Sequence, residues 1–242
     1  MSASTAAPRF RLRLWPGLAT LAALALLLGL GSWQVQRLHW KEGLIATRAA
    51  QLAAPTAPLP ATAADWQGWD FRKVSVRGTF RHELEQLFGA YAIDGRFGQH
   101  VLTPLVRADG PAILVDRGFV PTERAPVETR RAGEVPGEVV ITGIARFRGA
   151  DRPGWFTPAN QPAKRTWYWY DMAALAQVAG LQLLPVVVEA DATPNPGGLP
   201  LGGQTRTELP NNHLQYAITW YGLAAALVGV YIALCFDDGA RR

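Results

Sequence analysis

Two long stretches without a charged residue lie near the two ends of the chain. Residues 14–36 and residues 214–236 each comprise 23 positions and contain no Asp, Glu, Lys or Arg. A helix of that length extends about 34 Å, which is enough to cross a hydrocarbon core of about 30 Å. Trp15 and Trp33 lie near the two ends of the first stretch, as interfacial aromatic residues do. The pattern predicts two transmembrane helices, over residues 14–36 and 213–236.

The first stretch has a second interpretation, as a cleaved signal peptide. Basic residues precede it, and Gly29-Leu30-Gly31 is a small-x-small sequence typical of a cleavage site. The apolar run is longer than the usual core of a signal peptide, and Trp33-Gln-Val-Gln-Arg37 follows it at once. We therefore favour an uncleaved membrane anchor.

Basic residues set the expected topology, because positively charged flanks are retained in the cytoplasm. The three arginines before the first span and the two after the second are Arg9, Arg11, Arg13, Arg241 and Arg242. They place residues 1–13 and 237–242 in the cytoplasm and the middle of the chain outside it. Arg37 and Lys41, which directly follow the first span, favour the opposite orientation. Basic residues in a long translocated domain, however, have little influence on topology.

The middle of the chain consists mostly of short stretches with strand character. Residues 73–77, for example, alternate polar and apolar side chains as a half-exposed strand does. Glycine, proline and aspartate lie between the stretches and mark turns. The six predicted strands cover residues 71–80, 84–93, 100–106, 112–120, 138–148 and 185–190.

One helix is expected within this domain, with Asp171 as its N-cap and Gly180 just after its end. The fold class is therefore a membrane-anchored α+β protein, in which two transmembrane helices flank one mostly antiparallel β domain. Spaced strands with a single helix favour a small sandwich or an open barrel.

Two connecting segments differ in composition from the domain between them. Residues 37–64 comprise a helical stalk and then a Pro/Ala-rich linker, because the run from Ala54 to Ala64 breaks any helix. Residues 65–192 form the extracytoplasmic β domain. Residues 193–212 are rich in glycine and proline and are expected to be a flexible lead into the second span.

Composition supports a membrane protein and excludes a nucleic-acid-binding one. Hydrophobic residues make up 49% of the chain and charged residues 18%, whereas about 25% is usual for a soluble domain. Of the net charge of +5, four units arise at the flanks of the apolar stretches, because residues 38–212 contain 18 Lys and Arg against 17 Asp and Glu. The middle of the chain therefore has no broad basic surface for nucleic acid.

The single cysteine and the absence of catalytic motifs exclude several kinds of chemistry. Cys235 alone can form neither an intrachain disulfide nor a site with several thiolates. No sequence motif of a hydrolase, metalloprotease, nucleotide-binding loop or thiol oxidoreductase is present. Glu83 and Glu85 would share one face of a strand and are interpreted as solvated carboxylates. Asp116 and Arg117 are interpreted as an internal ion pair, and the chain is not expected to be an enzyme.

His213 is the strongest candidate for binding chemistry. It lies where the second span begins, and at 100° per residue Tyr216 and Trp220 fall on the same stripe of the helix. Neutral imidazole is the commonest protein ligand for metals and serves as an axial ligand of haem iron. A histidine beside aromatic residues is also typical of a simple interfacial anchor. His39, just outside the first span, could face His213 across the hairpin.

Five short motifs in order resemble the Surfeit-locus-one family of cytochrome c oxidase assembly proteins. They extend from the first span to the second and cover almost the whole chain. They are Gly31-Ser-Trp33-Gln34-Val-Gln-Arg37, Val74…Gly78-Thr-Phe80, Gly98-Gln-His-Val101-Leu-Thr103-Pro104-Leu105, Val115-Asp-Arg117-Gly118-Phe-Val120-Pro121 and Asn212-His213-Leu-Gln215-Tyr216-Ala217-Ile-Thr-Trp220-Tyr-Gly222. The fourth departs from the family pattern, since Asp116 and Phe119 replace the more usual Asn and Trp.

The resemblance implies a bacterial inner-membrane assembly factor for haem–copper cytochrome c oxidase, with both termini cytoplasmic and the central domain periplasmic. It implies that haem a binds with His213 as axial ligand of the iron, beside Tyr216 and Trp220. The implied partners are oxidase subunit I, into which haem a is inserted, haem a synthase, and the lipid bilayer. A membrane-tethered scaffold for oxidase assembly that never binds haem is the alternative.

Overall fold

The computed structural model describes residues 9–148 and 154–237. The described chain divides into one unit formed by its two end segments, up to Thr47 and from Glu208, and a second unit of Arg48–Thr207. Most of the predicted cytoplasmic segments, residues 1–8 and 238–242, lies outside the described residues.

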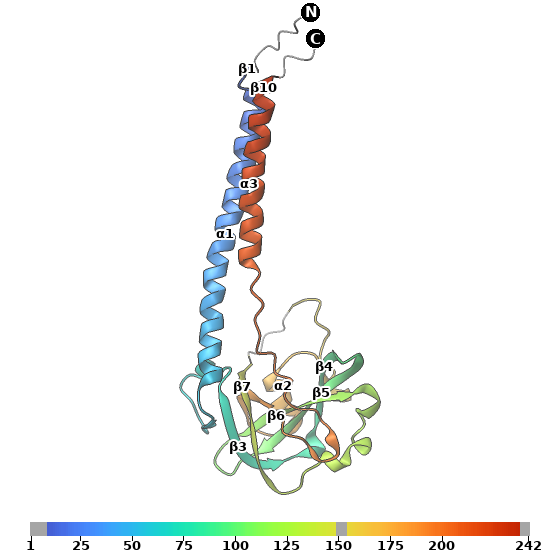
Figure 1. The fold of residues 1–242 in the computed structure, drawn as a ribbon. Coiled ribbons are helices and arrows are strands. Elements are labelled where there is room, and N and C mark those ends of the chain that lie inside the picture. The colour runs from blue at the N-terminus through green and yellow to red at the C-terminus, as the bar shows by residue number, and fades with distance from the viewer. Residues whose placement is uncertain (1–8, 149–153, 238–242) are drawn as a thin grey trace, which may run out of the picture. The chain divides into compact units, whose positions relative to one another are not determined.

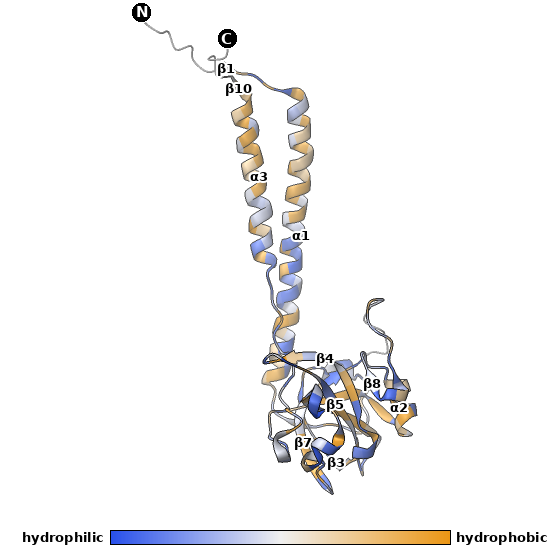
Figure 2. Cartoon of the chain, turned by 90° about the vertical axis from the view of Figure 1, so that its right-hand side faces the viewer, coloured by the Kyte–Doolittle hydropathy of each residue, from blue (hydrophilic) through white to orange (hydrophobic). Residues whose placement is uncertain are grey.

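Two antiparallel helices dominate the first unit (Figure 1). Helix α1 (Leu14–Ala53) begins where the first apolar stretch was predicted and continues without a break through the predicted stalk. Helix α3 (His213–Cys235) coincides with the second apolar stretch. At the ends of the hairpin, β1 (Arg9–Phe10) pairs antiparallel with β10 (Phe236–Asp237). Figure 2 shows apolar residues along α3 and along the half of α1 that lies nearest β1.

Small residues bring α1 and α3 close together. A Cβ at Gly31 would lie 2.8 Å from the ring of Tyr221, and one at Gly17 would lie 2.7 Å from the Tyr231 hydroxyl. The hydroxyl groups of Ser32 and Tyr221 are 3.2 Å apart. Close backbone approach at small residues is typical of packed membrane helices, and here it fixes how the two helices align.

All six predicted strands are present in the second unit. In chain order they are β3 (Lys73–Phe80), β4 (Gln86–Ile93), β5 (Arg96–Val106), β6 (Ala112–Pro121), β7 (Glu138–Phe147) and β9 (Leu183–Ala190). Two short strands, β2 (Ala57–Pro58) and β8 (Thr166–Trp167), extend the sheet at its ends. The order is β2-β3-β7-β9-β6-β5-β4-β8.

The sheet closes into a five-stranded barrel, which corrects the expectation of a sandwich or an open barrel. Strand β3 pairs with β7 along its length and with β5 at its end, so Thr79 lies opposite both Glu138 and Val106. Gly78 permits this closure, because a Cβ there would lie 2.4 Å from the Val106 carbonyl oxygen. The pairing is mostly antiparallel, as expected, but β6 and β9 run parallel.

Alternate residues of β6 and β9 pack into two separate cores. Ile113 and Val115 of β6 point into the barrel with Val186 and Val188 of β9. Leu114, which lies between Ile113 and Val115 on β6, points the other way and packs on the outer side of the barrel wall. These two strands are buried on both faces, because the barrel core covers one face and α2 with its neighbouring aromatic residues covers the other.

Helix α2 (Met172–Ala179) forms where its caps predicted it. The Asp171 carboxylate accepts a hydrogen bond from the Ala174 amide at 3.0 Å, and Gly180 ends the helix with φ of 61°. Leu175 of α2 is buried in the outer core. The prediction of one helix with these caps is confirmed.

The two connecting segments are held against the barrel. Ala57 and Pro58 pair with β3, and Leu59 is only 3% exposed within the barrel core. In the second segment, Leu201 pairs with Phe119 of β6. The compact unit thus runs from Arg48 to Thr207, so it includes the predicted Pro/Ala-rich linker and most of the predicted flexible lead.

The interpretation of three charged residues, Glu85, Asp116 and Arg117, is also wrong, whereas Glu83 is exposed as expected. Glu83 lies in a 3-10 turn (His82–Leu84), whereas Glu85 is buried and pairs with Arg130. The two therefore do not share a strand face. Asp116 pairs with His100, and Arg117 donates hydrogen bonds to the Gly133 carbonyl and to Asn195.

Asp116 and Arg117 do not pair with each other, because consecutive strand residues point to opposite faces.

Candidate functional site

The candidate residue His213 is the first residue of α3, directly after Asn212 at the N-cap. Pro210, three positions earlier, favours an extended conformation at Leu209, so the chain leading to α3 is not helical there. The side chain of His213 is half-buried.

Gln34 of α1 holds this imidazole. The Nδ1 atom of His213 lies 2.7 Å from Oε1 of Gln34, and the two residues are 179 positions apart in the sequence. Gln34 is 9% exposed and, with Gly31, is one of the two buried residues of α1. A buried amide in an apolar helix needs a hydrogen-bond partner, and His213 supplies it.

The contact selects one tautomer of neutral His213. Because an amide oxygen only accepts, Nδ1 carries the proton and donates it to Gln34. The lone pair then resides on Nε2. A histidine whose Nδ1 donates to an oxygen and whose Nε2 is unprotonated is the form that ligates a metal, and the oxygen fixes the ring's orientation.

The structure places Tyr216 and Trp220 on the same face of α3 as His213. Tyr216 is 54% exposed and Trp220 is half-buried. Further along the stripe the environment changes: Ala224 is buried, and Tyr231 lies against Gly17 of α1. Of the aromatic residues on the stripe, Tyr216 is the most exposed.

His39 does not take part in this arrangement. Its side chain is 70% exposed, and its Nδ1 lies 3.8 Å from a Glu42 carboxylate oxygen on the same helix. The residue that faces His213 across the hairpin is Gln34. Sequence reasoning missed Gln34 as a site residue, and the available signal was an amide within the charge-free stretch of residues 14–36.

Comparison with known proteins identifies the family. The model of the SURF1 family matches residues 21–225, which is most of the chain. The chain belongs to the SURF1 family.

Three relatives illustrate the similarity within the SURF1 family. The SURF1-like protein of Monosiga brevicollis is 40% identical over 92% of this chain and 88% of its own length. Surfeit locus protein 1 of Mus musculus is 41% identical over 82% of this chain and 68% of its own length. The Homo sapiens protein of the same name is 38% identical over 82% of this chain and 70% of its own length. These relatives are eukaryotic, so the expectation of a bacterial membrane stays a prediction.

The SURF1 family match includes both Gln34 and His213. These residues belong to the first and last of the five motifs, and the hydrogen bond between them joins the two motifs in space. The third and fourth motifs also meet, on β5 and β6, where Nδ1 of His100 lies 2.8 Å from a carboxylate oxygen of Asp116. The family match therefore spans two separate polar contacts, one in each unit.

Proposed function

We propose that this protein is a membrane-anchored assembly factor for haem–copper cytochrome c oxidase that binds haem a through His213 and aids its insertion into subunit I. The observation that carries the proposal is the contact between His213 and Gln34. It fixes the imidazole at the start of α3 with Nε2 free of the proton, as an axial ligand of haem iron requires.

The exposed apolar surface of the two helices supports membrane anchoring. In the most apolar 18-residue window of each helix, only 6% of α1 and 11% of α3 is buried within the chain. Large side chains such as Leu18, Leu26 and Val230 are 58–63% exposed. Apolar surface of this extent on two long helices would be unfavourable in water, whereas a bilayer covers it.

The side chains available as metal ligands favour a metal group that already has most of its ligands, such as haem iron. Among residues 9–148 and 154–237, no group of three His, Cys, Asp or Glu side chains could hold a bare metal ion. Haem iron already has four porphyrin nitrogens, so one imidazole from the protein is sufficient to attach it. A single axial ligand also permits release, which suits a carrier whose cargo moves to another protein.

Tyr216 and Trp220 give the cargo an apolar surface beside His213. Their positions on the same helix face leave aromatic rings available to contact a flat macrocycle. A site at the first turn of α3 would lie at the edge of the bilayer. Haem a, which is apolar, would therefore pass between proteins without crossing water.

The remaining parts of the proposal concern topology and partners. Both termini are cytoplasmic and the barrel unit is periplasmic, in a bacterial inner membrane. The barrel docks on oxidase subunit I, and haem a synthase is the supplier of the cargo. Within this proposal the protein performs no catalytic step; its residues bind and orient haem a.

An optical spectrum tests the proposal. The full-length protein is purified in detergent from cells that make haem a, beside His213→Ala and, as a control, Ile218→Ala at an exposed position of the same helix. A reduced α-band of haem a in the wild type and the control, lost in His213→Ala, is expected. Equal haem in all three would overturn the role of His213.

Stable protein without haem in any sample would favour the scaffold that never binds haem. A chimera separates the two functions further. The barrel unit on unrelated membrane spans should fail to support oxidase assembly if haem binds the hairpin, whereas a scaffold should keep its function.

A further inference from the structure

A cavity of about 680 Å³ lies on the outer side of the barrel wall, entirely within the unit Arg48–Thr207. Its walls come from β4, from residues 168–170 and from residues 204–206, and β5, β6, β7 and β9 also contribute. Cavities of this size are typical of sites for small molecules. Nothing in the proposed role of His213 uses it.

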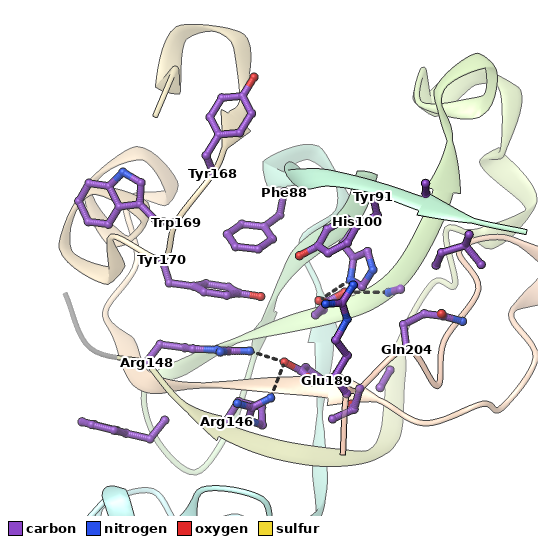
Figure 3. A pocket seen from close by; sticks show the side chains of 18 residues that line it. Phe88, Tyr91, His100, Arg146, Arg148, Tyr168, Trp169, Tyr170, Glu189 and Gln204 are labelled. Atoms are coloured by element: carbon purple, nitrogen blue, oxygen red, sulfur yellow. Dashed lines mark hydrogen bonds and ion pairs between the residues drawn. The ribbon is translucent and has the colours of Figure 1, made fainter. Parts of the chain in front are cut away.

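Stacked side chains form one wall of the cavity (Figure 3). The rings of Phe88 and Tyr170 are stacked, with centroids 4.1 Å apart and an interplanar angle of 24°. The guanidinium carbon of Arg148 lies 4.5 Å from the centroid of the same Tyr170 ring. Tyr168 and Trp169 continue this wall. Flat groups already pack face to face here, so the wall suits another flat group.

The second wall presents Tyr91 and His100, whose ring centroids are 4.2 Å apart. Nδ1 of His100 lies 2.8 Å from Oδ2 of Asp116, and the other carboxylate oxygen of Asp116 accepts the Gly118 amide hydrogen at 2.9 Å. Asp116 is thus fully engaged, and it orients His100 so that Nε2 is the ring nitrogen left for a ligand.

Three arginines line the cavity, and two of them have carboxylate partners. Arg146 and Arg148 both pair with the single carboxylate of Glu189, and Arg146 also pairs with Asp70. Within the described parts of the chain, Nε of Arg148 is buried and has no hydrogen-bond partner. Arg206 lines the cavity, is exposed and forms no ion pair with another described residue.

The tyrosines add no negative charge to the cavity at neutral pH. Burial, together with the nearby carboxylates of Asp116 and Glu189, raises the pKa of Tyr91 to about 12. Burial likewise raises the pKa of Tyr170 well above its usual value. The cavity therefore combines neutral aromatic walls with the guanidinium of Arg206, which has no ion-pair partner among the described residues.

We propose that this cavity binds a planar ring compound that carries an anionic group. The ring lies between the stack of Phe88 and Tyr170 and the opposite wall, and the anion pairs with Arg148 and Arg206. Nε2 of His100 contacts the polar edge of the ring. This site is separate from His213 and does not depend on the proposed haem binding.

Flavin mononucleotide and riboflavin form a matched pair of probes, because they share one planar ring and differ by a phosphate. Both are fluorescent and water-soluble, and stacking on aromatic side chains quenches their emission. They are titrated with the full-length protein in detergent. Flavin mononucleotide is expected to bind at least about tenfold more tightly than riboflavin, because its phosphate forms charge-assisted hydrogen bonds.

Three variants locate the binding. Arg206→Met changes an exposed side chain. It is expected to weaken the binding of flavin mononucleotide about tenfold and to leave the binding of riboflavin unchanged. Arg77→Met removes another exposed arginine, one that pairs with Glu138 away from the cavity, and should have no effect. His213→Ala should also leave binding unchanged, which separates this site from the haem proposal.

The proposal is overturned by any of three results. These are no quenching of flavin mononucleotide at protein concentrations up to about 1 mM, equal affinity for the two probes, or equal affinity of Arg206→Met and wild type for flavin mononucleotide. Loss of haem in His213→Ala with unchanged flavin mononucleotide binding would support both proposals separately.

Discussion

His213 and Gln34 form a 2.7 Å hydrogen bond that connects the first turn of α3 to a buried position of α1. The same contact does two things at once. It satisfies a buried amide in the helix pair, and it fixes the orientation and tautomer of the imidazole. The position of the candidate ligand therefore depends on the packing of the two helices, to which Gly31 and Tyr221 contribute.

Gln34→Leu should weaken haem binding while His213 remains present. Residues that orient a metal ligand typically affect affinity by about 10- to 100-fold, so a loss in this range is expected. The measurement is a haem titration followed by the Soret absorbance. Gln36→Leu is the matched control, because Gln36 is an exposed glutamine on the same helix. Equal losses in the two variants would contradict a specific role for Gln34.

The buried pair of Glu85 and Arg130 should be important for the stability of the barrel unit. Their side chains are only 4% and 2% exposed, and Nη1 of Arg130 lies 2.9 Å from a Glu85 carboxylate oxygen. Glu85→Ala leaves a buried guanidinium without its counterion, and a loss of about 3–5 kcal/mol in the free energy of unfolding is expected. Urea denaturation measures it.

Glu83→Ala is the control for this prediction, because Glu83 pairs with Arg81 at the surface. It should cost less than about 1 kcal/mol. Replacement of both Glu85 and Arg130 by leucine should recover part of the loss, since no unpaired charge remains. A similar cost for Glu83→Ala and Glu85→Ala would contradict the role assigned to burial.

Gly118→Ala should destabilise the contact between β6 and the segment before α3. Gly118 has φ of 109°, and a Cβ there would lie 1.9 Å from the Leu201 carbonyl oxygen. Backbone strain and steric overlap together are expected to cost about 3 kcal/mol or more. Gly137→Ala, with φ of 79° and open space around it, should cost only about 1–2 kcal/mol. Thermal unfolding of both variants makes the comparison.

Tyr91 should make the barrel unit sensitive to alkaline pH. Its folded-state pKa of about 12 exceeds the ordinary value of 10.0, chiefly because of burial. Between these two values the folded state binds more protons than the unfolded state, so stability should fall as pH rises through this window. Tyr91→Phe should reduce the slope of stability against pH, and urea denaturation at several alkaline pH values tests this. An unchanged slope would contradict the prediction.

Local features of the fold could be predicted from the sequence. Strands were recognisable from alternation and turn residues, and α2 from Asp171 and Gly180 at its ends. These features depend on neighbours within a few residues. The closure of the barrel did not appear in any local pattern, because it depends on only two residue pairs between β3 and β5.

The same limit applies to the candidate site. His213 was recognisable by its residue type, its place at a span boundary and the family resemblance. Gln34 was not, because its role arises from a contact across two helices distant in sequence. Asp116 was assigned to its sequence neighbour Arg117, whereas the strand pairing brings it to His100. Side-chain partners across a sheet depend on register, which composition does not specify.

The position of β9 between β6 and β7 has a consequence for biosynthesis. Strand β9 is the last of the barrel strands to leave the ribosome, yet it pairs with β6 on one edge and β7 on the other. A chain truncated before Leu183 would leave facing edges of both strands unpaired, and such edges recruit other chains. Premature termination in this region should therefore yield an aggregation-prone product that still carries α1, rather than a merely inactive one.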